Sequence, residues 1–205
     1  METMNRNEAK KMIERLKKEN EQWLSATKKA FMDGIFSIIE RVRVEKKKDF
    51  ILELIQNADD CDSSEISFDL LRSKIIIQNN GHPFKSDPDP TKDEIFAICK
   101  LGRTTKESGK IGYMGFGFRA VFEVSKKPEI YSGNFSFYLD KDMIVPHWID
   151  RIPRNIKTRL DKMKGKGSIF VLTGLSNEIR RDVENALENL SPTLLLYLQH
   201  LKRIK

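Results

Sequence analysis

Cysteine is scarce in this chain, and its scarcity argues against two kinds of stabilising site. Among the 205 residues there are two cysteines, Cys61 and Cys99, and they form no Cys-x-x-Cys pair. Neither of them has metal-ligand spacing with any of the three histidines. We therefore expect neither a disulfide framework nor a structural zinc site, and a reducing, cytoplasmic location is the default.

Long apolar segments are also missing. The longest purely apolar runs, such as 194–198, are far shorter than the stretch of about 20 residues that a membrane-spanning helix needs. Residues 1–18 are charged throughout and lack the apolar core of a signal peptide. The sequence thus predicts a cytoplasmic protein with no membrane partner.

The familiar signatures of two phosphate-handling classes are absent as well. The chain contains no GxxxxGK[ST] sequence, so it is not a P-loop protein. It also lacks the HRD and DFG sequences of protein kinases. Any nucleotide site must therefore be built in another way.

The amino-acid composition is typical of a globular domain with a net positive charge. Hydrophobic residues make up 39% of the chain and charged residues 33%, and the formal net charge is +7. Lysine pairs and triplets recur, as at 10–11 and 46–48, but they are interleaved with glutamate, as on solvated helix faces. Nucleic acid is therefore an alternative partner that the sequence does not favour.

Hydrophobic periodicity divides the chain into an N-terminal extension and a main domain. Residues 5–31 predict a long charged helix, and residues 35–44 predict a second one. Together they form a helical extension over 1–46, packed on or beside a domain over 47–205. The apolar stripe of the first helix most simply docks on its own domain, although homodimerisation through it stays open.

Within the main domain, helices and strands do not alternate strictly, which argues against a doubly wound fold. Residues 141–166 are basic and predict an irregular segment, and Thr91 is the expected cap of a short helix. The sequence predicts an α+β fold, a two-layer α/β sandwich with helices on one face of a mixed, mostly antiparallel sheet. We expect helices over 48–60, 91–99, 118–124, 177–190 and 192–204, and strands over 65–71, 74–78, 129–132, 135–139 and 167–172.

The helix over 48–60 carries the most informative motif, ExxxNxxD. Glu53, Asn57 and Asp60 are spaced so that they share one helical face, beside an apolar stripe. Amide and carboxylate oxygens are ligands for Mg²⁺, which usually keeps several waters and substrate phosphates as well. A nearby glutamate can orient or deprotonate an attacking water. Taken alone, the motif is more simply a solvated polar edge on an amphipathic helix.

Two further segments carry chemistry only in combination with the first. Gly112, Gly115 and Gly117 precede a helical pattern, and such glycines let backbone N–H groups approach a phosphate. Their GxxGxG order differs from the GxGxxG of dinucleotide folds. The strand over 74–78 is followed by 79–81, Asn-Asn-Gly, which offers a hydrogen-bonding edge beside a flat ring. Alone, each of the two segments is also an ordinary turn.

The order of these motifs resembles the ATP-binding (Bergerat-fold) domain of the GHKL superfamily. That superfamily comprises gyrase, the ninety-kilodalton heat-shock chaperones, histidine kinases and MutL. The resemblance covers residues 40–173. The strings at 53–60, 97–106, 110–122 and 128–133 are more similar still to the sacsin and NO VEIN type of histidine kinase-like ATPase domain.

The resemblance implies a catalytic role for one residue and a metal-binding role for another. Glu53 becomes the general base that positions the hydrolytic water, and Asn57 becomes the sole protein ligand of Mg²⁺. Asp60 supports the pocket through hydrogen bonds or water. Histidine kinases usually lack a carboxylate at the place of Glu53, so the resemblance implies hydrolysis of ATP to ADP and phosphate.

The resemblance also implies which residues contact the nucleotide. Residues 104–106 belong to a lid, the amides of 115–118 donate to the triphosphate, and Ser168 supplies a hydroxyl at the adenine end. The complete nucleotide-binding set is Asn57, Asp60, Asn79, Gly81, Thr104, Thr105, Lys106, Gly112, Gly115, Phe116, Gly117, Phe118 and Ser168.

Asn79 departs from the superfamily pattern, in which an aspartate accepts a hydrogen bond from the adenine amino group. Asparagine still accepts through its carbonyl oxygen, and it can also donate to a ring nitrogen. Because hydrogen bonds to charged groups contribute about 1.5–3 kcal/mol, loss of the charge weakens adenine binding by up to that amount and relaxes base preference. Asn-Asn at this place is a feature of the sacsin-like branch.

The expected function is that of an Mg-ATP-binding, slowly hydrolysing domain that drives conformational change in a larger chaperone-like or regulatory protein. In related proteins a lysine or arginine from a following transducer domain completes the site. The stretch over 192–204 suits a domain boundary, so we expect the chain to be the N-terminal part of a longer protein. Two alternatives stay open, a non-hydrolysing nucleotide-sensing module and the ATPase of a nucleic-acid-associated repair or defence protein.

Overall fold

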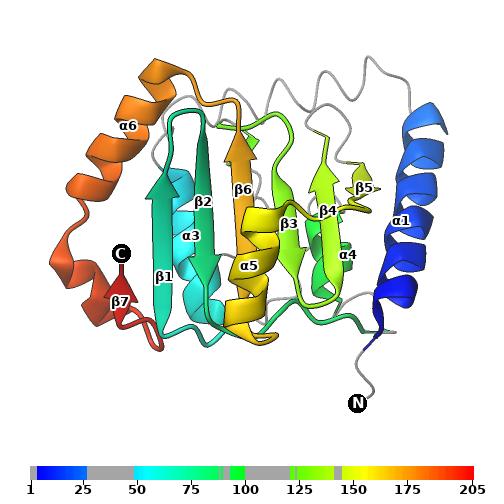
Figure 1. Cartoon of the computed structure of the whole chain (residues 1–205), viewed down its shortest axis with the longest axis horizontal. Helices are drawn as coiled ribbons and strands as arrows, with labels where there is room; N and C mark the ends of the chain where they lie inside the picture. Colours follow the sequence, from blue (N-terminus) through cyan, green and yellow to red (C-terminus); the bar gives the residue numbers. More distant parts are fainter. Residues whose placement is uncertain are drawn as a thin grey trace.

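A computed structural model describes residues 4–26, 49–87, 89, 93–99, 121–122, 124–140 and 145–205. Within this part of the chain the helices flank a single open sheet (Figure 1). The elements are α1 (Arg6–Ala26), α3 (Asp49–Asp60), β1 (Glu65–Leu70), β2 (Lys74–Asn79), α4 (Glu94–Cys99), β3 (Glu129–Ser132), β4 (Phe135–Leu139), β5 (Pro146–Trp148), α5 (Arg154–Met163), β6 (Ser168–Thr173), α6 (Asn177–Glu188), the 3-10 helix η2 (Pro192–Tyr197) and β7 (Arg203–Ile204).

The described strands form one sheet of mixed but mostly antiparallel pairing. Its seven strands lie in the order β5-β4-β3-β6-β2-β1-β7. β1 pairs with β7 in parallel, and the other pairings are antiparallel. The predicted hairpin at 129–139 is confirmed, with its turn at Gly133 and Asn134. The α+β fold class and the mixed, mostly antiparallel sheet are confirmed.

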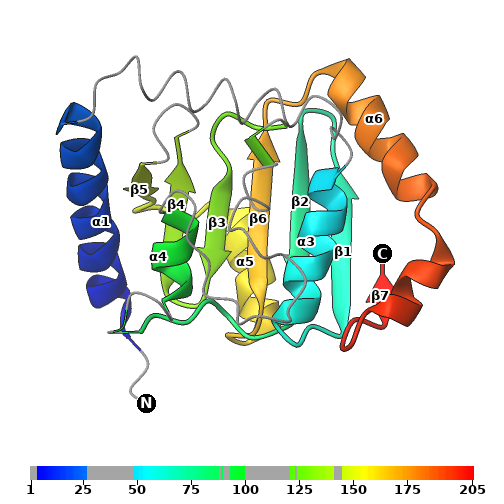
Figure 2. The same ribbon diagram turned by 180° about the vertical axis from the view of Figure 1, so that it is seen from behind.

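Alternate residues of the central strands enter two separate cores. Ile75 and Ile77 of β2 belong to the larger core, which includes residues of α3, α4 and α1, whereas Ile76 belongs to a smaller one. Figure 2 shows α3 and α4 on the face of the larger core, and Figure 1 shows α5 on the opposite face. Side-chain alternation along a strand produces this division.

The helix α5 corrects the expectation of an irregular segment over 141–166. Ile156, Leu160 and Met163 form a stripe on α5 at four- and three-residue spacing, and they pack with Ile76 and its neighbours. The helix begins after Pro153 and ends at Lys164, which adopts a left-handed conformation with φ 53°. The density of basic residues concealed this apolar stripe. Residues 146–148 also form a short strand, β5.

The end of the chain corrects a second expectation, the helix over 192–204. Residues 192–197 form only a 3-10 helix, and the chain then extends to pair with β1 as β7. The backbone N–H groups of 199–201 bond to the Asp59 carboxylate instead of to carbonyls of a helix. The Asp59 side chain therefore takes the place of the helical hydrogen bonds that we expected for these residues.

The first helix packs against the β5 edge of the sheet. Ile13 and Leu16 are buried in the larger core, and Arg6 donates to the Ser136 hydroxyl and lies over the Trp148 ring. The predicted helix over 35–44 lies outside the described residues. None of the helices in the described part of the chain combines the length and apolarity that a membrane span requires.

Two short helical segments differ in detail from expectation. Helix α4 begins at Glu94, and the Asp93 carboxylate accepts the Phe96 N–H at 2.7 Å, so Asp93 caps the helix in place of the expected Thr91, which lies outside the described residues. Of the helix expected over 118–124, residues 121–122 are in a short 3-10 turn and residues 118–120 are not described.

Gly167 fixes the junction between β2 and β6. Its φ is +69°, and a Cβ atom there would overlap the carbonyl oxygen of Asn79. Its N–H donates to the Gly81 carbonyl at 2.6 Å. Close approach and a left-handed backbone therefore both require glycine at this position.

We expect Gly167→Ala to lower the free energy of unfolding much more than Gly165→Ala. Both positions have positive φ, but a Cβ at Gly165 meets nothing within 4 Å. The left-handed backbone alone costs about 1–2 kcal/mol, and overlap at Gly167 adds roughly 1–3 kcal/mol. Urea unfolding of both variants measures the difference. Equal losses would show that the Asn79 contact imposes no constraint.

Candidate functional site

Helix α3 holds the ExxxNxxD residues on a buried support. Its apolar stripe is buried as predicted, with Ile51, Leu54, Ile55 and Ala58 each at most 2% exposed. Glu53, Asn57 and Asp60 are half-buried, which is the exposure expected at the border of that stripe. The predicted helix is confirmed, and the three polar residues lie beside its buried stripe.

The C-terminal end of α3 is fastened to the loop that follows β2. The chain leaves α3 through a tight turn, in which Asp62 has a φ of 57°. The Cys61 carbonyl then accepts the His82 N–H at 2.9 Å. A Cβ atom at Gly81 would overlap that carbonyl and the Ser63 hydroxyl. Glycine at position 81 is therefore required for close approach of the strand end to the helix end.

Three polar side chains lie in one row across β3, β6 and β2. Asn79 is paired with Ser168, and Ser168 is paired with Ser132. Their neighbours two residues along each strand, Ile77, Phe170 and Ile130, belong to the larger core. Because side chains two apart share a face, the row faces the layer that contains α3.

Hydrogen bonds order this row. The hydroxyls of Ser132 and Ser168 are 2.7 Å apart, and Ser132 Oγ also accepts the Phe84 N–H at 2.8 Å. The Asn79 side-chain oxygen accepts the Gly81 N–H at 3.3 Å. All three polar side chains are at most 5% exposed. The row is thus a set of oriented, uncharged hydrogen-bonding groups beside the end of α3.

The structure brings together only part of the predicted site. Asp60 at the end of α3 lies within one turn of the contact between Cys61 and the 81–82 loop, and Asn79 and Ser168 lie in adjacent strands. Asn57 lies about one turn before Asp60 along α3, and Glu53 lies about two turns before it. The other predicted residues lie outside the described residues: Thr104, Thr105, Lys106, Gly112, Gly115, Phe116, Gly117 and Phe118.

Sequence reasoning missed Asp59, a buried carboxylate next to Asp60 on α3. Its oxygens accept the backbone N–H groups of Gln199, His200 and Leu201 at 2.9, 2.7 and 2.8 Å. Burial raises the pKa of this carboxyl, but the three amide bonds together outweigh burial and the pKa is lowered. Its contribution to stability is therefore present above the ordinary carboxyl pKa and is lost as pH falls through the lowered value.

Ser132 was also missed, because no spacing in the sequence relates it to Ser168. The signal that existed was weak: a serine at the end of a predicted strand, facing the same side as the strand's apolar residues. Only the pairing of β3 with β6 shows that the two hydroxyls meet.

A separate groove of about 1480 Å³ lies beside the 82–87 segment. Its walls come from α1, α4, the β3–β4 turn and that segment, with Met12, Phe84 and Phe96 among its apolar residues. None of the predicted site residues that the structure describes lines this groove. It is therefore distinct from the row of Asn79, Ser168 and Ser132, although Phe84 connects the two.

Comparison with known proteins identifies relatives of this chain. It matches no protein-family model. It is 33% identical over 178 residues to "Protein NO VEIN" of Arabidopsis thaliana, which covers 76% of this chain and 6% of that protein. It is 31% identical over 107 residues to "Sacsin" of Homo sapiens, which covers 43% of this chain and 2% of that protein. The chain is related to a segment of NO VEIN and of sacsin.

A third relative has a different kind of name. The chain is 30% identical over 108 residues to the "Putative type II restriction enzyme HgiDII" of Herpetosiphon aurantiacus, which covers 49% of this chain and 16% of that protein. In all three cases the matched segment is a small part of a larger protein.

We expect Ser132→Ala to destabilise the protein more than Ser168→Ala. Loss of the Ser132 hydroxyl leaves the Phe84 N–H without its acceptor, which costs about 1–3 kcal/mol. Loss of the Ser168 hydroxyl leaves that bond intact and costs about 0.5–1.5 kcal/mol. Denaturant midpoints of the two variants provide the measurement. A larger effect of Ser168→Ala would mean that the Phe84 contact is unimportant.

Proposed function

We propose that this chain is an ATP-binding domain of the GHKL type that binds Mg-ATP and hydrolyses it slowly. The observation that carries the proposal is the row of Asn79, Ser168 and Ser132. It faces the layer of α3 and lies where the end of that helix is fastened to the strand end. A nucleotide site with this order of motifs requires the end of α3 to lie beside the end of β2. The similarity to NO VEIN and sacsin also supports the proposal.

The row suits the base of the nucleotide. Uncharged acceptors and donors held by a rigid main chain can pair with the edge of a planar polar ring. Asn79 offers a carboxamide where a carboxylate would carry charge, so its bond to an amino group is neutral. The proposed adenine end is therefore specific through geometry rather than through charge.

In the proposed reaction, Glu53 orients a water molecule and removes its proton as the water attacks the terminal phosphorus of ATP. The bond from that phosphorus to the bridging oxygen breaks, and the products are ADP and phosphate. The half-buried position of Glu53 on α3 is compatible with this role. The 104–106 and 112–118 segments are the proposed holders of the phosphates.

The donor chemistry of α3 fits magnesium held mainly by its ligand. Among the described residues there is no group of three or more His, Cys, Asp or Glu that could hold a metal ion. Asn57 supplies a single amide oxygen, and Mg²⁺ commonly binds through one or two protein groups plus phosphates and water. When bound, the ion neutralises phosphate charge. Asn57 is the residue that we propose holds it.

The isolated chain should turn over slowly. It spans 6% of NO VEIN, 2% of sacsin and 16% of the restriction-enzyme relative along the matched segments. We propose that a basic side chain from another domain of the larger protein completes the site. The ATP cycle then drives conformational change in that protein.

Calorimetry and phosphate release should separate binding from hydrolysis. We expect the wild-type chain to bind ATP with Mg²⁺, and to turn over far below the enzyme median of about 10 s⁻¹. Glu53→Ala should bind ATP within about threefold of wild type, a change of less than ~1 kcal/mol, and release no phosphate. Asn57→Ala should lose the magnesium dependence of binding.

Glu178→Ala, an exposed carboxylate in the first turn of α6, is the matched control and should behave as wild type. A wild-type chain that binds no ATP contradicts the proposal outright. A full-length protein that binds ATP but never releases phosphate instead supports a nucleotide sensor.

A second candidate function, a nucleic-acid-associated ATPase, is favoured by the surface around α5. Exposed basic side chains gather in and beside this helix, and Arg159 is paired with Asp69. These exposed residues are Arg151, Arg154, Lys157, Lys162, Lys164 and Lys166. A restriction enzyme, as the third relative is named, acts on DNA. We propose a phosphate-backbone contact on this face as the second possibility.

Fluorescence anisotropy with a labelled DNA duplex tests the second candidate. If the α5 face contacts phosphates, Lys157→Glu with Lys162→Glu should weaken binding. The slope of log affinity against log salt should fall by roughly 0.9 per lost contact. Lys11→Glu with Lys18→Glu on α1 gives the same charge change elsewhere on the surface. Equal effects of the two pairs, or no binding at low salt, would remove this candidate.

A further inference from the structure

The last residues of the chain are fastened to the end of α3 by one buried carboxylate. Asp59 is 9% exposed, and it accepts the three successive amides of 199–201. The next residue along α3 is Asp60, which belongs to the proposed nucleotide site. Leu201 is buried in the larger core, so this attachment is also packed. We call residues 199–205 the strap.

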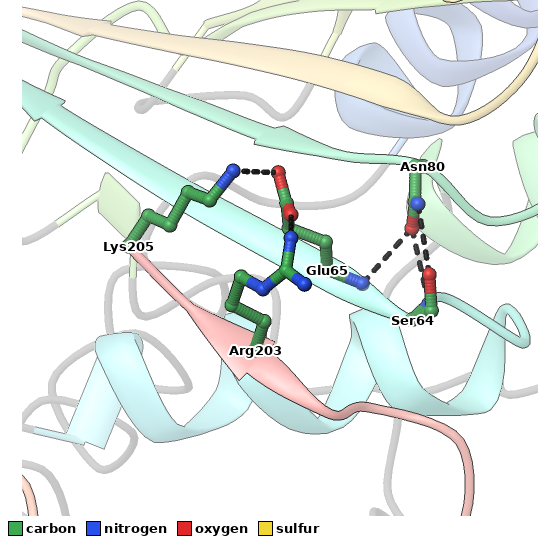
Figure 3. A network of polar contacts seen from close by, with 5 residues as sticks. All are labelled: Ser64, Glu65, Asn80, Arg203 and Lys205. Atoms are coloured by element: carbon green, nitrogen blue, oxygen red, sulfur yellow. Dashed lines mark hydrogen bonds and ion pairs between the residues drawn. The ribbon is translucent and has the colours of Figure 1, made fainter.

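The strap continues along the outer edge of β1. Lys202 N–H donates to the Ser64 carbonyl at 3.0 Å, and β7 then pairs with the first residues of β1. The Glu65 carboxylate forms ion pairs with both Arg203 and Lys205, each with an N–O distance of 2.8 Å. Figure 3 shows the three side chains together. The hydrogen bond from Lys205, aided by Arg203, lowers the pKa of the Glu65 carboxyl. The strap is thus joined to the strand that follows α3.

A second polar link runs from the start of β1 to the loop at the proposed adenine end. The Asn80 side-chain oxygen accepts the N–H groups of Ser64 and Glu65, each at 3.0 Å. Its amide nitrogen donates to the Ser64 hydroxyl at 3.0 Å (Figure 3). Asn80 lies between Asn79 and Gly81 in the loop after β2. Ser64 and Glu65, which contact the strap, therefore also hydrogen-bond to this loop.

We infer that the strap positions the nucleotide site, with Asp59 and Asn80 as its positioning residues. Asp59 links the strap to the end of α3 beside Asp60, and Asn80 links the residues that receive the strap to Asn79 and Gly81. The inference has two parts. The ligand half, that the strap affects ATP binding, rests on the proposed function. The structural half, that the strap orders the loop at Gly81 and His82, does not. Because coupling between sites is reciprocal, nucleotide binding should in turn order the strap.

The ion pairs of Glu65 and the hydrogen bonds of Asp59 contribute unequally to the stability of the strap. Arg203 and Lys205 are 65% and 53% exposed at their side chains, and exposed ion pairs contribute little. Asp59 is buried, and replacing one of its carboxylate oxygens by an amide nitrogen leaves at least one of the three backbone N–H groups without an acceptor. The Glu65 pairs therefore serve as a matched control for Asp59.

Amide hydrogen exchange tests the structural half without any nucleotide. In Asp59→Asn we expect faster exchange at 199–201 and also at Gly81 and His82, by about tenfold. Asp59→Glu should restore part of the protection, and Glu65→Gln should leave Gly81 and His82 unchanged. Faster exchange confined to 199–201 would overturn the inference. If Asp59→Asn does not fold, Asn80→Ala, at an exposed position, should speed exchange at Gly81 and His82.

Calorimetry tests the ligand half on the same variants. We expect Asp59→Asn and Asn80→Ala to weaken ATP binding about tenfold, while Glu65→Gln binds as wild type. Added ATP should slow exchange at 199–201 in the wild-type chain. Unchanged affinity in both variants would overturn the inference while leaving the proposed function intact. Absence of ATP binding by the wild-type chain would instead refute the proposed function, and the exchange at Gly81 and His82 would still decide the structural half.

Discussion

Close backbone contact between Gly81 and the end of α3 is the constraint on which the rest of the site depends. A side chain at position 81 would overlap the Cys61 carbonyl, which accepts the His82 N–H. Gly167, which immediately precedes β6, lies equally close to the carbonyl of Asn79 at the end of β2. With both glycines in place, a helix end and two strand ends meet without side chains between them. The polar groups at this junction are therefore placed by the main chain.

This constraint separates charged from uncharged chemistry within the proposed site. Asn79, Ser132 and Ser168 form the uncharged row, whereas Glu53 and Asp60 are the acidic residues of the motif along α3. Buried uncharged groups lose little on desolvation when they are hydrogen-bonded to each other. Carboxylates are kept half-buried at the border of the apolar stripe. The proposed ligand, ATP with Mg²⁺, offers a neutral ring to the uncharged row, and its cation offsets the negative charge that carboxylates and phosphates share.

Residue spacing within short segments predicted the elements that depend mainly on contacts between residues near in sequence. The α3 stripe and the β3–β4 hairpin follow from spacing and turn residues, and both are confirmed. Helix α5 was missed because basic residues masked its stripe, and the closing helix failed because 199–201 bonds to Asp59. The pairing of Ser132 with Ser168 is likewise invisible in the sequence. Contacts between distant segments, rather than propensity, decided each of these cases.

The adjacent carboxylates Asp59 and Asp60 at the end of α3 have different roles in the fold. Asp60 shares the helical face of Glu53 and Asn57, whereas Asp59 is rotated by about 100° around the helix. Its partners exist only because 199–201 leave the helical conformation, which frees their N–H groups. The departure from the expected closing helix is therefore what keeps Asp59 ionised and buried. Helix α3 thereby presents one face to the proposed ligand and another to the strap.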